Sequence, residues 1–108
     1  MVRQLSINEK IDIANNYVLT KHSLSRLKER YTLNKQDIQN TIIKSKLAYI
    51  NTDNSINIQI GKSDNYYVFV KDNNNKYIMI TCKEPSQNGI SLYEKFKLAL
   101  NGKKYLKK

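Results

Sequence analysis

Residues 47–83 read LAYINTDNSINIQIGKSDNYYVFVKDNNNKYIMITCK, and this stretch decides the fold class. Ile56, Ile58 and Ile60 alternate with polar residues, which is the period of two expected of a half-buried strand. Segments rich in Asn, Asp and Gly separate four apolar runs, and residues 72–75 form a hairpin turn between two of them. Every connection is too short for a parallel crossover. The stretch therefore predicts a four-stranded antiparallel meander.

Upstream of residue 47 the apolar residues follow the helical period of 3.6. Ser6 and Glu9 have the spacing of a capping box, which predicts a first helix at about residues 7–15. Ile7, Ile11 and Ala14 are expected to share its apolar stripe.

Three more elements are expected before the meander. Residues 17–19 indicate a brief extended piece. A second helix is predicted from about Lys21 to Tyr31 with Thr20 as its N-cap, and a third helix begins near Asn34.

A C-terminal helix at about residues 91–102 follows the meander, because Ser91 and Glu94 repeat the capping-box spacing. The order of helices, meander and helix indicates an α+β fold with helices on one face of the sheet. A chain of 108 residues is expected to form a single domain over residues 1–108.

The charge is strongly positive, with 19 Lys and Arg residues against 9 Asp and Glu residues, a formal net charge of +10. A field of this sign concentrates polyanions, of which nucleic acid is the usual one. A solvated lysine surface is the alternative. The eight tyrosines among the lysines allow base stacking, or else belong to the core and rim of the sheet.

Several classes of function are excluded by composition. Cys82 is the only cysteine and His22 the only histidine, so an intramolecular disulfide cannot form and a zinc site built from this chain alone is not expected. No glycine-rich phosphate loop or other cofactor motif is present, so no cofactor is predicted. No apolar run approaches the roughly 20 residues that span a bilayer, so we expect no membrane association and a cytoplasmic location.

The second helix carries the candidate chemistry. His22, Arg26 and Arg30 follow one another at intervals of four residues and lie on the arc opposite Leu27. An imidazole moves protons near neutral pH, and a guanidinium binds a phosphate with two hydrogen bonds. RNA transesterification needs both functions. The alternative is a solvated helix face on which Glu29 pairs with Arg26.

The last strand adds two candidates. If Ile78, Ile80 and Cys82 face the core, then Thr81 and Lys83 face the other way. A threonine hydroxyl can bond a phosphate oxygen, and a lysine can hold its charge. Lys83 is therefore a candidate for nucleic-acid binding, as is Lys21 beside His22. An ordinary β-branched strand residue is the alternative for Thr81.

Residues 19–38, LTKHSLSRLKERYTLNKQDI, resemble the opening of small toxin-like proteins related to the barnase–EndoU–colicin–RelE superfamily of metal-independent ribonucleases. The resemblance continues more weakly into the hairpin of residues 66–83. It implies a RelE/barnase-like core at about residues 17–84, with His22, Arg26, Arg30 and Thr81 as catalytic residues. The implied function is that of an RNA-cleaving toxin-like domain that leaves 2′,3′-cyclic phosphate ends without a metal. An antitoxin or immunity protein is an implied partner.

A second hypothesis needs no catalysis. The same basic face suits a regulator or inhibitor of the phage type that binds nucleic acid or a host protein complex. Cleavage of RNA in the presence of EDTA would separate the two hypotheses.

Overall fold

The computed structural model describes residues 2–83 and 91–101. In chain order its elements are β1 (Arg3–Gln4), α1 (Ile7–Asn16), β2 (Tyr17–Leu19), α2 (Lys21–Arg30), α3 (Lys35–Ile43), β3 (Ala48–Ile50), β4 (Ile56–Gln59), β5 (Tyr66–Lys71), β6 (Tyr77–Lys83) and α4 (Leu92–Leu100). The fold is α+β, as the change of period at residue 47 predicts.

The helices begin at the predicted caps. The Ser6 hydroxyl accepts a hydrogen bond from the Glu9 N–H, and the Glu9 carboxylate accepts one from the Ser6 N–H, which completes the capping box of α1. The Ser91 hydroxyl likewise accepts from the Glu94 N–H at the start of α4. The predicted end of that helix, residue 102, lies outside the described residues.

The sheet has six strands in the order β1-β3-β4-β5-β6-β2. Its centre is the predicted antiparallel run from β3 to β6, but the prediction of four strands and no parallel pair is wrong. β1 adds an antiparallel strand beside β3, and β2 lies parallel to β6. The helices and the whole meander separate β2 from β6 in sequence, so connections within residues 47–83 gave no sign of this pair.

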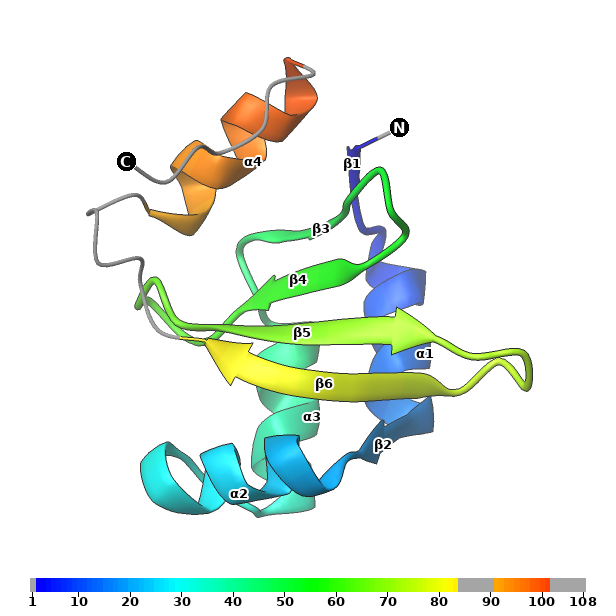
Figure 1. The fold of residues 1–108 in the computed structure, drawn as a ribbon, viewed down its shortest axis with the longest axis vertical. Coiled ribbons are helices and arrows are strands. Elements are labelled where there is room, and N and C mark those ends of the chain that lie inside the picture. The colour runs from blue at the N-terminus through cyan, green and yellow to red at the C-terminus, as the bar shows by residue number, and fades with distance from the viewer. Residues whose placement is uncertain (1, 84–90, 102–108) are drawn as a thin grey trace.

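Helices cover both faces of the sheet, which corrects the prediction that they share one. α1 and α3 lie side by side behind the sheet, and α2 lies beside β6 (Figure 1). Tyr66 and Tyr67 are neighbours on β5 and therefore point to opposite faces. Tyr67 packs in the cluster that contains residues of α1 and α3, whereas Tyr66 packs with Leu92 and Phe96 of α4. The residues of α4 thus cover part of the opposite face, around Tyr49 and Tyr66.

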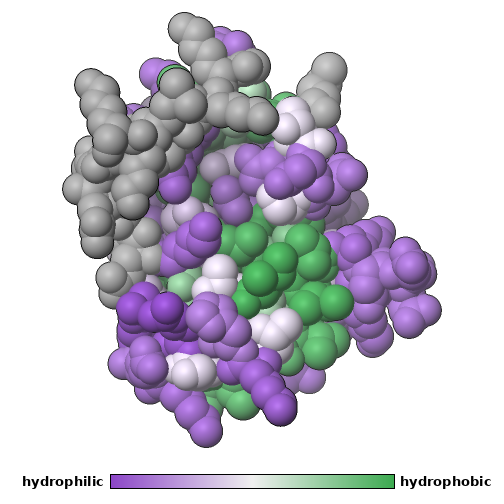
Figure 2. Space-filling view, viewed as in Figure 1, coloured by the Kyte–Doolittle hydropathy of each residue, from purple (hydrophilic) through white to green (hydrophobic). Residues whose placement is uncertain are grey.

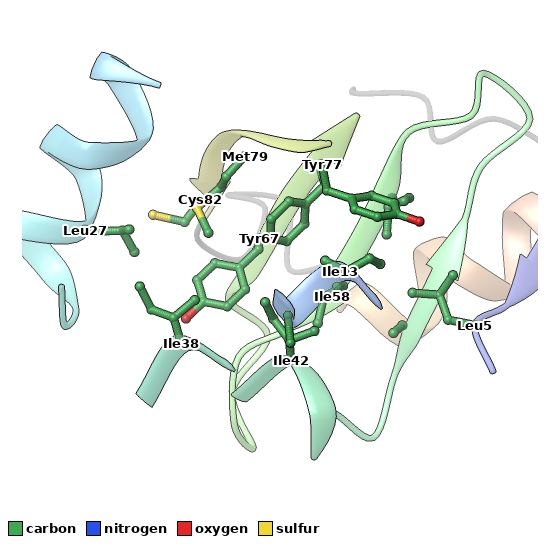
Figure 3. Close-up of a cluster of buried hydrophobic side chains, with 14 residues drawn as sticks. Leu5, Ile13, Leu27, Ile38, Ile42, Ile58, Tyr67, Tyr77, Met79 and Cys82 are labelled. Carbon is green, nitrogen blue, oxygen red and sulfur yellow. The ribbon is translucent and has the colours of Figure 1, made fainter. Parts of the chain in front are cut away.

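The main core lies between the sheet and the first three helices (Figure 3). Leu27, Ile38 and Ile42 point from the helices toward Tyr67 and Met79 on the sheet, and all five are buried.

The apolar stripe predicted for α1 is wrong in part, because Ile7 and Ile11 lie on the exposed side of the helix. Ile7 is 54% exposed and Ile11 is 39% exposed, while Ile13 is buried. Polar contacts fix the first turns of α1 instead, since Glu9 pairs with Arg3 and the Lys10 ammonium donates a hydrogen bond to the Ser45 carbonyl.

The tyrosines serve mainly as core residues within the part of the chain that the structure describes. Four of them are buried, namely Tyr49, Tyr66, Tyr67 and Tyr77. Tyr93 is exposed. Each helix in residues 2–83 and 91–101 is too short or too polar to cross a bilayer.

Candidate nucleic-acid interface

The start of α2 is fixed by a second capping box, formed by Thr20 and Ser23. The Thr20 hydroxyl accepts a hydrogen bond from the Ser23 N–H at 3.1 Å, and the Thr20 N–H donates to the Ser23 hydroxyl at 2.8 Å. Ser23 is fully buried, as is Leu27 one turn later. These two anchors set the rotation of α2, so the arc that carries His22 points away from the core.

Thr20 also joins α2 to β6. Its hydroxyl oxygen lies 3.1 Å from the Met79 carbonyl oxygen and 3.3 Å from the Ile80 carbonyl oxygen. The parallel pairing of β2 with β6 ends at Leu19 and Met79. The chain therefore leaves the sheet at Thr20, and α2 continues beside the second half of β6.

A bulge in β6 decides which side chains face that helix. Val68 pairs with Thr81 and Phe69 pairs with Met79, so Ile80 is an extra residue in the strand. Met79 and Cys82 are both buried in the main core. The two residues between them consequently lie on the other face of the sheet.

Because of the bulge, the faces predicted for the first residues of β6 are wrong, whereas those predicted for Thr81 and Cys82 are right. The sequence places Ile78 and Ile80 in the core, but Tyr77 and Met79 are buried there, while Ile78 is partly exposed and Ile80 is 40% exposed. Because the extra residue shifts the alternation by one, Cys82 is in the core as predicted. Thr81 faces away from the core, also as predicted.

α2 and β6 together line a cavity of about 360 Å³, which we call the α2–β6 cavity. Its lining residues are His22, Arg26, Arg30, Thr81, Cys82 and Lys83. The four residues expected to be catalytic thus meet at one place, and Lys83 joins them. Lys21 is exposed but does not line the cavity.

The described residues that line the α2–β6 cavity carry charge of one sign. Arg26 is partly buried, whereas His22, Arg30 and Lys83 are exposed. No carboxylate lines the cavity among the residues that the structure describes. The alternative pairing of Glu29 with Arg26 is not observed there, and the ion pair found in those residues joins Arg3 to Glu9. Three cationic side chains converging beside an imidazole form a site suited to an anion.

Sequence reasoning missed two features of this site. The cap at Thr20 is predicted by its residue type, but its contact with β6 depends on the parallel pairing of β2. Cys82 is predicted as a core residue, and the sequence gives no sign that it also lines the cavity. No three His, Cys, Asp or Glu side chains gather as a metal site in residues 2–83 or 91–101.

A second cavity, of about 410 Å³, lies at the far end of the sheet between α1 and the turns. Its ionic groups already have partners within the protein. Arg3 donates two hydrogen bonds of 2.7 and 2.6 Å to Glu9, and its hydrogen bond is the main cause that lowers the pKa of Glu9 to about 2. Lys71 stands 5.5 Å from the centre of the Tyr77 ring. We therefore place the candidate site at the α2–β6 cavity.

Comparisons of the chain with protein-family models, with curated proteins and with solved structures give no match.

Proposed function

We propose that the α2–β6 cavity binds a phosphodiester of RNA and cleaves it by transesterification, as a RelE/barnase-like ribonuclease. The observation that carries the proposal is the meeting of His22, Arg26 and Thr81 at one cavity, with Arg30 and Lys83 beside them. The antiparallel run from β3 to β6 carries Thr81 and Lys83 to the side of α2, where the proposed chemistry needs them. The net charge of +10 favours a polyanionic substrate.

The chemistry follows from the residue types. His22 takes the proton of the 2′-hydroxyl, whose oxygen then bonds to phosphorus as the bond from phosphorus to the 5′ oxygen breaks. The leaving oxygen takes a proton from water, since the exposed His22 leaves the site open to solvent. Arg26 clamps the two non-bridging oxygens, and Arg30 and Thr81 stabilise the added negative charge. The product carries a 2′,3′-cyclic phosphate, and no metal takes part.

The test is cleavage of total RNA in the presence of EDTA. Wild-type protein is expected to cut, and the new 3′ ends are expected to carry the cyclic phosphate. His22→Ala should slow cleavage by about 100-fold or more, because the proton transfer is lost. Lys28→Ala removes a charge from the exposed part of α2 outside the cavity and serves as the matched control. Undiminished cleavage by His22→Ala would rule out this mechanism.

One observation favours a second function, RNA binding without cleavage. Transesterification uses both a base and an acid, whereas the described residues that line the cavity include one histidine, a single candidate for both roles. A binding protein needs the cations alone. In that case RNA binds without being cut, and His22→Ala binds RNA as wild type does while Arg26→Ala does not.

A further inference from the structure

An apolar strip crosses the open face of the sheet next to the α2–β6 cavity. Val18 of β2 pairs with Ile78 of β6, which pairs in turn with Val70 of β5, so the three side chains form a row on one face. Ile80 extends this row toward the cavity. We call Val18, Val70, Ile78 and Ile80 the apolar strip.

The strip is exposed to an unusual degree for aliphatic side chains on a sheet. Val18 is 46% exposed and Ile80 is 40% exposed, while Val70 and Ile78 are partly buried. Figure 2 shows hydrophobic residues gathered over the β5 and β6 half of this face, with hydrophilic residues around them. Such a patch with a polar rim is typical of a binding surface.

The strip and the cavity are continuous through the bulge. Ile80 and Thr81 are the two residues between the buried Met79 and Cys82, so both side chains lie on the same face. Thr81 lines the cavity. Ile78 follows at about 7 Å along the strand from Ile80. A molecule held by its phosphate in the cavity therefore has its neighbouring groups over the apolar strip.

We propose that the apolar strip contacts the nucleobases of unpaired RNA whose phosphates bind at the α2–β6 cavity. This inference rests on the proposed function and names its substrate class. The cations beside the cavity complement phosphates, and the strip complements the apolar faces of the bases next to them. In a duplex these faces are stacked on one another inside the helix and cannot reach a protein surface. The site is accordingly selective for single strands.

The experiment compares two single-stranded oligonucleotides of equal length. One carries all its bases and the other is abasic, and both are methylated at the 2′ oxygens so that neither is cut. Wild-type protein is expected to bind the strand with bases about tenfold more tightly than the abasic strand, because burial of the bases against aliphatic side chains adds to phosphate contact. Ile80→Ser should reduce this tenfold preference by a factor of about five and leave the affinity for the abasic strand unchanged.

Ile7→Ser is the matched control, since Ile7 is 54% exposed on α1, outside the strip. It should keep the full preference. Val18→Ser provides a second variant at the sheet edge if Ile80→Ser does not fold. Equal binding of both strands by wild-type protein, or an unchanged preference in the folded strip variants, would overturn the inference while leaving phosphate binding intact. Binding of neither strand would instead overturn the proposed function.

Discussion

Arg26 is the arginine of the α2–β6 cavity that is partly buried, and it stands one helical turn from His22. Adjacent turns place the Cβ atoms about 6 Å apart, so both side chains can contact one phosphate. Arg26→Ala should reduce cleavage by about 100-fold, because one donor to the negatively charged phosphate is lost, and the free energy of unfolding should stay nearly unchanged. Arg26→Lys should recover only part of the lost activity, because an ammonium keeps the charge but cannot donate two parallel hydrogen bonds to the phosphate.

Lys28→Ala is the control for charge and is expected to match wild type in these assays. Rates are measured on a labelled single-stranded RNA, and unfolding is followed by circular dichroism in urea. If Arg26→Ala unfolds the protein, the guanidinium is structural. If the folded variant is fully active, Arg26 is not part of the site.

For single residues, the sequence predicts the face of the helix or strand on which a side chain lies better than it predicts what that side chain contacts. The spacing of His22, Arg26 and Arg30 predicts a shared helix face, and all three line one cavity. Their chemical roles stay predictions. The outward position of Thr81 is confirmed, but the alternation used to derive it fails at Ile80, because an inserted residue leaves no mark in a β-branched run.

At the scale of elements, the cap of α2 determines the geometry of the site. Thr20→Val removes the hydroxyl that accepts from Ser23 and that reaches the Met79 carbonyl. Loss of an N-cap of this kind costs about 1–2 kcal/mol in the free energy of unfolding. RNA binding should weaken as well, because α2 loses its fixed position beside β6.

Thr20→Ser keeps the hydroxyl and should restore both properties. Urea denaturation gives the stability, and titration with single-stranded RNA gives the affinity. A Thr20→Val protein that loses stability but binds RNA as tightly as wild type would show that the cap does not position the site.

The contact between β1 and α1 makes stability depend on pH. The Arg3 guanidinium holds the pKa of Glu9 at about 2, below its ordinary value of 4.5. A depressed pKa in the folded state stabilises the protein above pH 4.5, and this contribution is lost as the pH falls toward 2. Glu9→Gln should therefore flatten the loss of stability across that range.

The matched variant is Glu29→Gln, which removes an exposed carboxylate from α2. Thermal unfolding measured across the acid range distinguishes the two. If both variants keep the wild-type slope, the pair of Arg3 and Glu9 does not contribute to acid stability.

Local signals predict most elements but not the order of the strands. The caps at Ser6, Thr20 and Asn34 predict where the first three helices begin, since each cap lies within a few residues of the groups it satisfies. The parallel pair of β2 and β6 joins residues about sixty positions apart, and a three-residue edge strand carries too little pattern to specify a partner. The position of α4 on the face opposite α1 and α3 likewise depends on its packing against Tyr49 and Tyr66. In the sequence these two tyrosines have the pattern of ordinary strand residues.

At the scale of the whole molecule, the net charge of +10 makes binding sensitive to salt. Each phosphate neutralised on a single strand contributes a slope of about 0.7 in the logarithm of affinity against the logarithm of salt concentration. Three cations at the cavity therefore predict a slope of about 2 or more between about 50 and 200 mM salt. Arg26→Ala should lower the slope by about 0.7. A slope near zero would point to a protein partner.

The most direct test of the α2–β6 cavity uses the single histidine of the chain. Its imidazole gives one set of ring resonances in an NMR spectrum, so every change reports on this one position. Titration with a single-stranded RNA methylated at the 2′ oxygens is predicted to shift the His22 ring signals in step with binding. The same titration of Arg26→Ala should shift them only at much higher RNA concentration. Saturable RNA binding, seen in backbone signals elsewhere, with unchanged His22 signals would contradict the assignment of the site.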